Sequence, residues 1–148
     1  MCPEQIVAKW GPERKEFTMN RPEFYGEDLL FFFDGKPREL SLYEALQGKM
    51  EAEFPECSVK VQKTQISFYG RRLFAAVSLP RSRKSFPEHS ILVTLGLPYK
   101  LESPRAAVTV EPYPGRWTNH VPVCTEEQID RELLGWLREA YAFSESKR

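Results

Sequence analysis

The sequence predicts an α+β domain in which an antiparallel meander sheet of about five strands packs against an N-terminal and a C-terminal helix. Apolar residues alternate with a period of two in the middle of the chain, recur every three or four residues on either side, and are separated by turn sequences. The 148 residues, 41% of them hydrophobic, suffice for one core. We expect residues 1–23 to form an irregular arm and residues 24–148 a single domain.

The N-terminal part of the chain predicts little regular structure before residue 24. Prolines, a glycine and mixed charges interrupt residues 1–23, where we expect at most a short helix around residues 4–10. Aromatic residues and leucines between Phe24 and Phe33 then predict a short helix that docks on the core. The turn sequence Asp34-Gly35-Lys36-Pro37 ends it.

A second helix is predicted from about Leu42 to Glu53. Ser41 and Glu44 have the spacing of a capping box, in which each side chain bonds the backbone N–H of the other, and Pro55 ends the helix. Its apolar positions recur at helical spacing and form one buried stripe: Tyr43, Leu46, Met50 and Phe54.

Period-two patterning after Ser58 predicts the strands. The alternation in residues 59–61 and 66–68 has opposite parity, which a turn or bulge near Thr64 would reconcile. Both faces of residues 73–79 are apolar, so this strand is expected to be central. Three further strands are predicted at residues 91–97, 106–111 and 117–123, with loops at 80–90 and 98–104. Pro122 lacks an N–H and indicates a sheet edge or a strand end.

A C-terminal helix is predicted from a second capping box, formed by Thr125 and Gln128. The apolar residues that follow lie on one stripe, which would face the sheet: Ile129, Leu133, Trp136 or Leu137, Ala140 and Tyr141. If both helices cover one face of the sheet, the other face or its loops remain available for binding.

The charge distribution predicts a basic sheet between acidic helical segments. Residues 1–57 carry a net charge of −5, residues 58–124 carry +7 and residues 125–148 carry −2. The sequence has no apolar run long enough to span a bilayer and no secretory signal, so we expect a cytoplasmic protein without a membrane partner. Three widely spaced cysteines indicate free thiols, and neither a metal site nor a cofactor is predicted.

The common catalytic signatures are missing from the sequence. It contains no Walker loop, no G-x-G-x-x-G, no G-x-S-x-G and no H-E-x-x-H. Paired carboxylates for acid–base chemistry would have to come from the strand region, which offers only Glu88, Glu102 and Glu111. Glycosidase-like chemistry is therefore not expected.

Four segments of the chain, taken together, resemble a known family. They are Lys63-Thr-Gln-Ile-Ser-Phe, Arg72-Leu-Phe-Ala-Ala-Val, Ser103-Pro-Arg105 and Glu111-Pro-Tyr-Pro-Gly-Arg-Trp-Thr-Asn-His120. In this order they resemble an uncharacterised bacterial family known as domain of unknown function 5655, over about residues 24–148. The resemblance implies no activity. This chain departs from the pattern at Asn119, where the resemblance leads us to expect a second histidine.

The candidate site consists of basic and aromatic residues from the strand region. Guanidinium groups offer paired donors to phosphate or carboxylate, and aromatic rings can stack on a base. The candidate ligand-binding residues are Lys63, Arg71, Arg72, Arg105, Arg116, Trp117 and His120. The alternative is that these are solvated or partnered surface charges, with Arg105 and Arg116 paired to glutamates of the acidic helices.

Three functions follow as hypotheses. The first is a non-catalytic binding module for an anionic ligand, phosphate-bearing or nucleic acid. The second is a structural or protein-interaction domain that contacts a partner or a second copy through the hydrophobic N-terminal residues Trp10, Phe17, Phe24 and Tyr25. The third is an enzyme with Arg116 and His120 in its site, since the reference pKa of histidine suits a general base.

Overall fold

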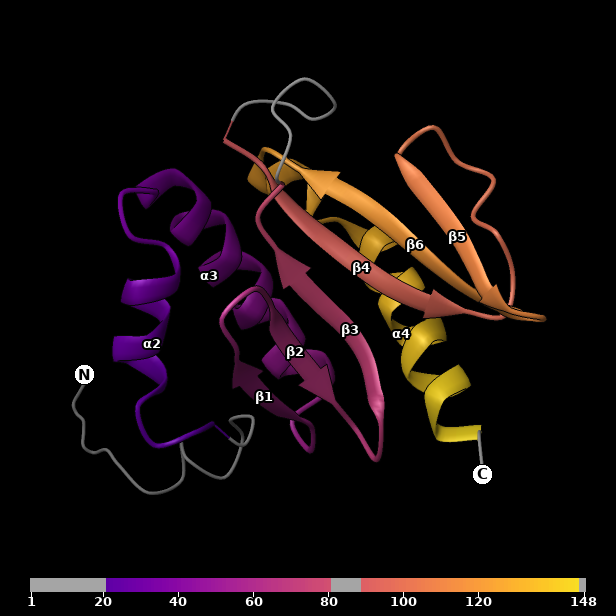
Figure 1. Cartoon of the computed structure of the whole chain (residues 1–148), viewed down its shortest axis with the longest axis horizontal. Helices are drawn as coiled ribbons and strands as arrows, with labels where there is room; N and C mark the ends of the chain where they lie inside the picture. Colours follow the sequence, from indigo (N-terminus) through magenta and orange to yellow (C-terminus); the bar gives the residue numbers. More distant parts are fainter. Residues whose placement is uncertain (1–20, 81–88, 147–148) are drawn as a thin grey trace.

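Six antiparallel strands form one sheet, in the order β1-β2-β3-β4-β6-β5, in the computed structural model, which describes residues 21–80 and 89–146 (Figure 1). The strands are β1 (Ser58–Val61), β2 (Ile66–Tyr69), β3 (Leu73–Ser78), β4 (Ile91–Leu97), β5 (Val108–Tyr113) and β6 (Arg116–Val123). The helices are α2 (Tyr25–Phe32), α3 (Pro37–Glu53) and α4 (Arg131–Ser146), with a 3-10 turn η1 (Glu126–Gln128) before α4. The α+β prediction is confirmed.

The sheet is a meander from β1 to β4, after which β6 and β5 exchange places. β6 pairs with every residue of β4, from Ile91↔Val123 to Leu97↔Trp117, and β5 lies outside β6 at the edge. The composition of β5 suits this position. Val108 and Val110 are exposed, and Pro112 cannot donate to a further strand.

Several strand predictions are confirmed. Residues 62–65 form the turn expected near Thr64, closed by a 2.8 Å bond from the Gln62 N–H to the Gln65 carbonyl. β3 lies in the interior of the sheet, between β2 and β4. Pro122 lies near the end of β6, beyond the last paired residue of β5, as its missing N–H requires.

The start of α3 differs from the prediction. The helix begins at Pro37, because proline is tolerated at the first helical position, where the N–H has no partner in the helix. Ser41 therefore lies inside the helix, and the predicted Ser41–Glu44 capping box is wrong. Gly35 ends the preceding turn with φ +72°, a left-handed conformation that glycine adopts without a steric penalty.

The start of the C-terminal helix is also displaced. The Gln128 side chain accepts the Thr125 N–H at 3.3 Å, so the predicted box pairing exists, but it closes η1. α4 itself begins at Arg131, where the Asp130 carboxylate accepts the Leu133 N–H at 3.0 Å.

Helices and sheet enclose one hydrophobic core. α3 and α4 pass behind the strands in the view of Figure 1, and α2 lies beside them near β1. The predicted stripe of α3 is buried, and the Tyr25 and Tyr43 hydroxyls bond each other at 2.6 Å within the core. The core includes the largest fully buried side chains: Tyr43, Leu46, Met50, Ile66, Phe68, Ile91, Leu95, Leu97, Ile129, Leu133 and Leu137.

Some predictions fall wholly or mostly outside the described residues. The irregular arm over residues 1–23, the short helix around residues 4–10 and most of the loop over residues 80–90 belong to this group. The domain boundary at residue 24 stays a prediction. Among the described residues, no helix has the length and apolar character needed to cross a membrane.

Candidate functional site

The two faces of the sheet have different neighbours and different side chains. Residues that pair across neighbouring strands share a face, so the register assigns each strand position to one side. Val93 pairs with Val121 and Leu95 with Asn119 on the face that the helices cover, here called the helix face. The opposite side, the open face, carries Ser58, Lys60, Ser67, Tyr69, Leu73, Ala76, Ser78, Leu92, Thr94, Gly96, Val108, Val110, Tyr113, Arg116, Thr118, His120 and Pro122.

No aspartate or glutamate occupies a paired position of the open face in the six described strands; Glu111, at the irregularity of β5, has no partner in the register. The helices are acidic instead. From their sequences, α2 carries a net charge of −2, α3 of −2 and α4 of −1. The negative charge of the described helices therefore lies mainly in a separate layer from the open face, although the Glu145 carboxylate of α4 accepts the Arg71 N–H at 2.7 Å at one end of the sheet.

The positive charge of the middle segment lies mainly in connections between strands. Of the ten Lys and Arg residues in 58–124, only Lys60 and Arg116 belong to described strands. Five lie in described turns and connections (Lys63, Arg71, Arg72, Lys100 and Arg105), and three lie in 81–88, outside the described residues. The expected basic sheet is thus a nearly neutral sheet with basic ends.

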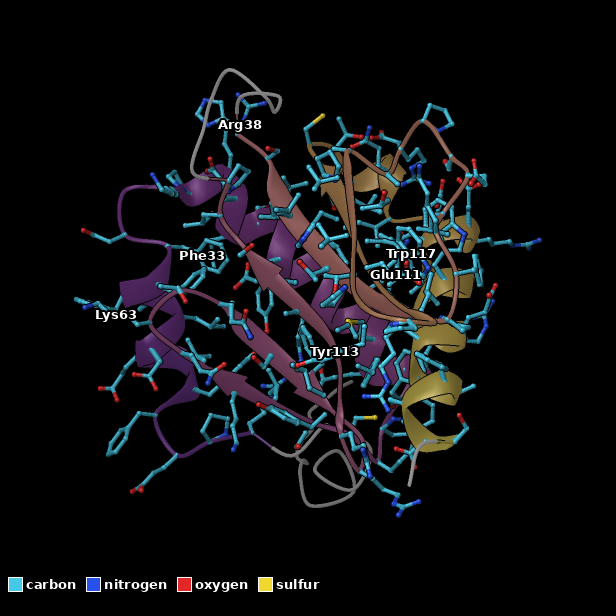
Figure 2. All side chains as sticks on the ribbon, turned by 45° about the vertical axis from the view of Figure 1, so that its right-hand side comes forward. Phe33, Arg38, Lys63, Glu111, Tyr113 and Trp117 are labelled. Carbon is cyan, nitrogen blue, oxygen red and sulfur yellow. The ribbon has the colours of Figure 1, made fainter. Side chains whose placement is uncertain are left out.

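The seven candidate residues do not form one cluster. Successive hairpins turn at alternate ends of a meander, so Lys63, in the β1–β2 turn, lies at the end opposite to Arg71 and Arg72, in the β2–β3 turn. Arg116 follows the β5–β6 turn and shares the end of Arg71 and Arg72. Figure 2 shows Lys63 on the side of the molecule away from Tyr113 and Glu111 of that hairpin.

Arg105 joins the connection before β5 to the start of α4. One guanidinium nitrogen lies 3.1 Å from Asp130 and 2.9 Å from Glu132, and the other donates to the Gln128 carbonyl at 2.6 Å. The guanidinium also lies over the Trp136 ring, 5.5 Å from its centroid. The contacts of Arg105 therefore fit the alternative interpretation, in which it is a charge paired within the protein. Its hydrogen-bond donors are directed into the protein.

Trp117 and His120 lie on opposite faces of β6. Trp117 pairs with Leu97 on the helix face, whereas His120 pairs with Thr94 on the open face. The His120 Nδ1 lies 2.9 Å from the Thr94 hydroxyl. Burial lowers the pKa of His120 below 6.5. The imidazole is therefore neutral at pH 7 and offers a donor and an acceptor near the centre of the open face.

A histidine at position 119, in place of Asn119, would not share a site with His120. Adjacent strand residues point to opposite faces, and Asn119 is fully buried on the helix face. Its Oδ1 accepts the Leu101 N–H at 3.1 Å and its Nδ2 donates to the Tyr99 carbonyl at 3.4 Å. Asn119 thus holds the connection after β4 against the sheet.

Lys60 and Thr94 are residues of the open face that the sequence reasoning did not select. The Lys60 ammonium lies 5.1 Å from the centroid of the Tyr69 ring, on the β1–β2 side of this face. The alternation of side chains along a strand places Lys60 on the face opposite to Val59 and Val61, so its position could be predicted from the sequence. Thr94 could be linked to His120 only once the β4–β6 register was known.

The described residues give little support to a catalytic centre. Arg116 and His120 are four residues apart on one face of a strand, so their Cα atoms are about 13 Å apart at 3.3 Å per residue. Burial raises the pKa of the Cys57 thiol to about 12, so it is protonated at pH 7. Within residues 21–80 and 89–146, no three His, Cys, Asp or Glu side chains form a group that could hold a metal ion.

The residues proposed for protein contacts are also divided. Phe24 is exposed, but Tyr25 is buried and bonded to Tyr43, so it is part of the core. Trp10 and Phe17 lie outside the described residues.

A shallow depression of about 460 Å³, partly lined by Lys100, Ser103 and Thr109, lies beside the connection between β4 and β5.

The comparisons with known proteins give one match. A family model described as "Domain of unknown function (DUF5655)" matches residues 32–144, which span the described elements from the end of α2 to most of α4. No curated protein and no solved structure matches the chain.

Proposed function

This chain belongs to the family of domains of unknown function DUF5655, as expected from its motifs, and because the function of that family is unknown we propose one from the geometry of the chain. We propose that the open face of the sheet is a binding surface for a phosphate-bearing polyanion, single-stranded nucleic acid in particular. The observation that carries the proposal is the separation of charge between the two layers. The open face has no carboxylate among its paired positions in the described strands, and the described helices behind it are acidic.

The distribution of cations on this surface favours an extended ligand. Lys60 on β1 and Arg116 on β6 are four strand spacings apart, about 19 Å at 4.8 Å per strand, too far for one phosphate to reach both. Arg71 and Arg72 add positive charge at the Arg116 end. A chain of phosphates can contact these groups in succession, as polyanions do on open protein surfaces.

The centre of the open face offers groups suited to bases rather than phosphates. Ala76 is small but buried, whereas Gly96 is half-buried and has no side chain, so a flat ring can approach the backbone there. His120 and Thr94 offer neutral hydrogen-bonding groups beside it, and Tyr69 and Tyr113 offer rings for stacking at its two sides. The succession of cations, aromatic rings and hydrogen-bonding groups along the open face supports single-stranded nucleic acid as the ligand.

The test is fluorescence polarisation with labelled single-stranded DNA and RNA at 50 and 200 mM NaCl. If Lys60, Arg71, Arg72 and Arg116 each neutralise one phosphate, affinity should fall about 50-fold between the two salt concentrations. Charge reversal at Arg71, Arg72 and Arg116 should abolish binding. Arg131→Glu is the matched control, because Arg131 is an exposed arginine on α4, in the helical layer.

Two results would contradict the proposal. The absence of binding to either oligonucleotide at 50 mM NaCl would remove it. Equal loss of affinity in the Arg131→Glu variant would show that net charge, and not the open face, governs binding. A protein-interaction function is the second candidate, supported by the exposed apolar side chains of α2, and its partner is considered below.

A further inference from the structure

The exposed large hydrophobic side chains of the described residues gather in two regions. Phe24, Leu30 and Phe31 lie on α2 or at its start and form the α2 patch. Val108, Val110 and Tyr113 lie on β5 and form the β5 patch. The remaining two, Leu73 and Tyr99, lie at the sheet end where the β5–β6 turn is also found. Figure 1 shows α2 and β5 at opposite sides of the molecule.

The α2 patch is an outward helix surface surrounded by carboxylates. Tyr25 and Leu29, four residues apart, point into the core, so Phe31 points away from it and is 85% exposed. Exposure of a large apolar side chain such as that of Phe31 to water is unfavourable. The neighbouring acidic residues are Glu23, Glu27, Asp28 and Asp34.

The β5 patch is an apolar surface of the edge strand with one cation, Arg116, and one carboxylate, Glu111, in the same hairpin. Val108 and Val110 share the open face and are 41% and 49% exposed. Tyr113 pairs with Arg116, and the nearby Glu111 carboxylate accepts the Gly115 N–H at 3.0 Å. Among the described strands, β5 pairs with β6 alone, so its outer edge has no partner within the sheet.

We propose that the α2 patch of one copy of this chain docks on the β5 patch of a second copy. Each patch supplies apolar side chains, and the carboxylates around one complement Arg116 beside the other. Because the two patches lie on opposite sides of the molecule, the contact is head to tail, and the pair retains one unused β5 patch on one copy and one unused α2 patch on the other. The protein therefore associates into open chains or rings.

The test uses two variants, each of which breaks one half of the contact. Sedimentation velocity of the unmodified protein should show species larger than a dimer as concentration rises. Phe31→Asp and Val110→Asp should each sediment as a monomer, with at least a 10-fold loss of self-affinity. An equimolar mixture of the two should give a dimer and nothing larger, because it contains one intact pair of patches per dimer.

The same measurements can overturn the proposal. A monomer at millimolar concentration of the unmodified protein would do so. A Val110→Asp variant that still associates would overturn it, because that outcome indicates contacts between two α2 patches. A mixture that stays monomeric would also overturn it, because it means that the α2 patch does not bind the β5 patch. Ala142→Asp, at an exposed position of α4, is the control that should leave association unchanged. Tyr113→Glu replaces Val110→Asp if circular dichroism shows that the latter is unfolded. The β5 patch belongs to the open face, so Phe31→Asp, which changes no residue of that face, separates the two proposals: it should abolish association and leave nucleic-acid binding unchanged.

Discussion

The two faces of the sheet are formed by the same six strands but differ in burial and in side-chain chemistry. On the helix face, Val93, Leu95 and Val121 are fully or almost fully buried among apolar neighbours. On the open face, the positions between them carry Thr94, His120 and small residues, with hydrogen bonds in place of apolar contacts. Strand alternation thus separates a face that stabilises the fold from the face that we propose to bind a ligand, and substitutions on the two should have different costs.

The largest expected effect is on the helix side of the core. Leu137 of α4 is fully buried, and Leu137→Ala removes apolar burial and leaves a cavity. The free energy of unfolding should fall by about 2–5 kcal/mol. Val110→Ala, on the open face, should cost less than about 1 kcal/mol. Urea unfolding of both variants measures the difference, and equal losses would contradict the division between the two faces.

The second-largest effect on stability is expected at Asn119, a buried polar residue on the helix face. Asn119→Leu keeps the side-chain size but leaves the Leu101 N–H without its hydrogen-bond acceptor. We expect a loss of about 1–3 kcal/mol, because a buried donor without a partner carries its full desolvation cost. Faster amide exchange at Leu101 should accompany it. An unchanged stability would show that the connection after β4 does not depend on Asn119.

A smaller effect is expected where the connection before β5 meets α4. Arg105→Ala removes the bonds to Asp130 and to the Gln128 carbonyl, together with packing on Trp136. Stability should fall by about 1–2 kcal/mol. Arg105→Lys should recover less than half of it, because an ammonium lacks the forked geometry that reaches several acceptors. Full recovery by lysine would mean that charge alone matters at this position.

The smallest effect is a pH dependence from the open face. Burial lowers the folded-state pKa of His120 below its ordinary 6.5, so near pH 6 the unfolded chain binds more protons than the folded one. Stability should therefore fall as pH decreases from 7.5 through 6.5 towards the folded-state pKa. His120→Gln should weaken this dependence in unfolding curves at pH 5.5, 6.5 and 7.5. Parallel curves for both proteins would mean that His120 ionises alike in both states.

Much of the fold could be predicted, and the failures share a cause. Apolar patterning and turn sequences located the described helices and strands, because burial of one face imposes a period on most of these segments. The start of α3 was misplaced because Ser41 has the spacing of a cap, whereas the chain already turns at Gly35 and begins the helix at Pro37. The exchange of β5 and β6 was not visible because alternation does not state which strand lies beside β4.

The candidate site could be predicted only in its chemistry. Basic and aromatic residues were recognised in the middle segment, but their spacing in sequence said nothing about which end or face of the sheet each would occupy. Hairpin geometry separates Lys63 from Arg71 and Arg72, and the β4–β6 register brings His120 to Thr94. Arg105 was equally basic by sequence, and only its position beside Asp130 and Glu132 shows what its guanidinium contacts.

The sequence by itself determined the α+β class, the apolar stripes, the uneven charge and the family of this protein, because each of these is a property of neighbouring residues or of a linear motif. The tertiary structure alone decided the strand order, the pairing of Thr94 with His120 and the separation of most of the acidic layer from the open face. These depend on contacts between residues distant in the chain. Their free energies arise only when the strands and helices pack together.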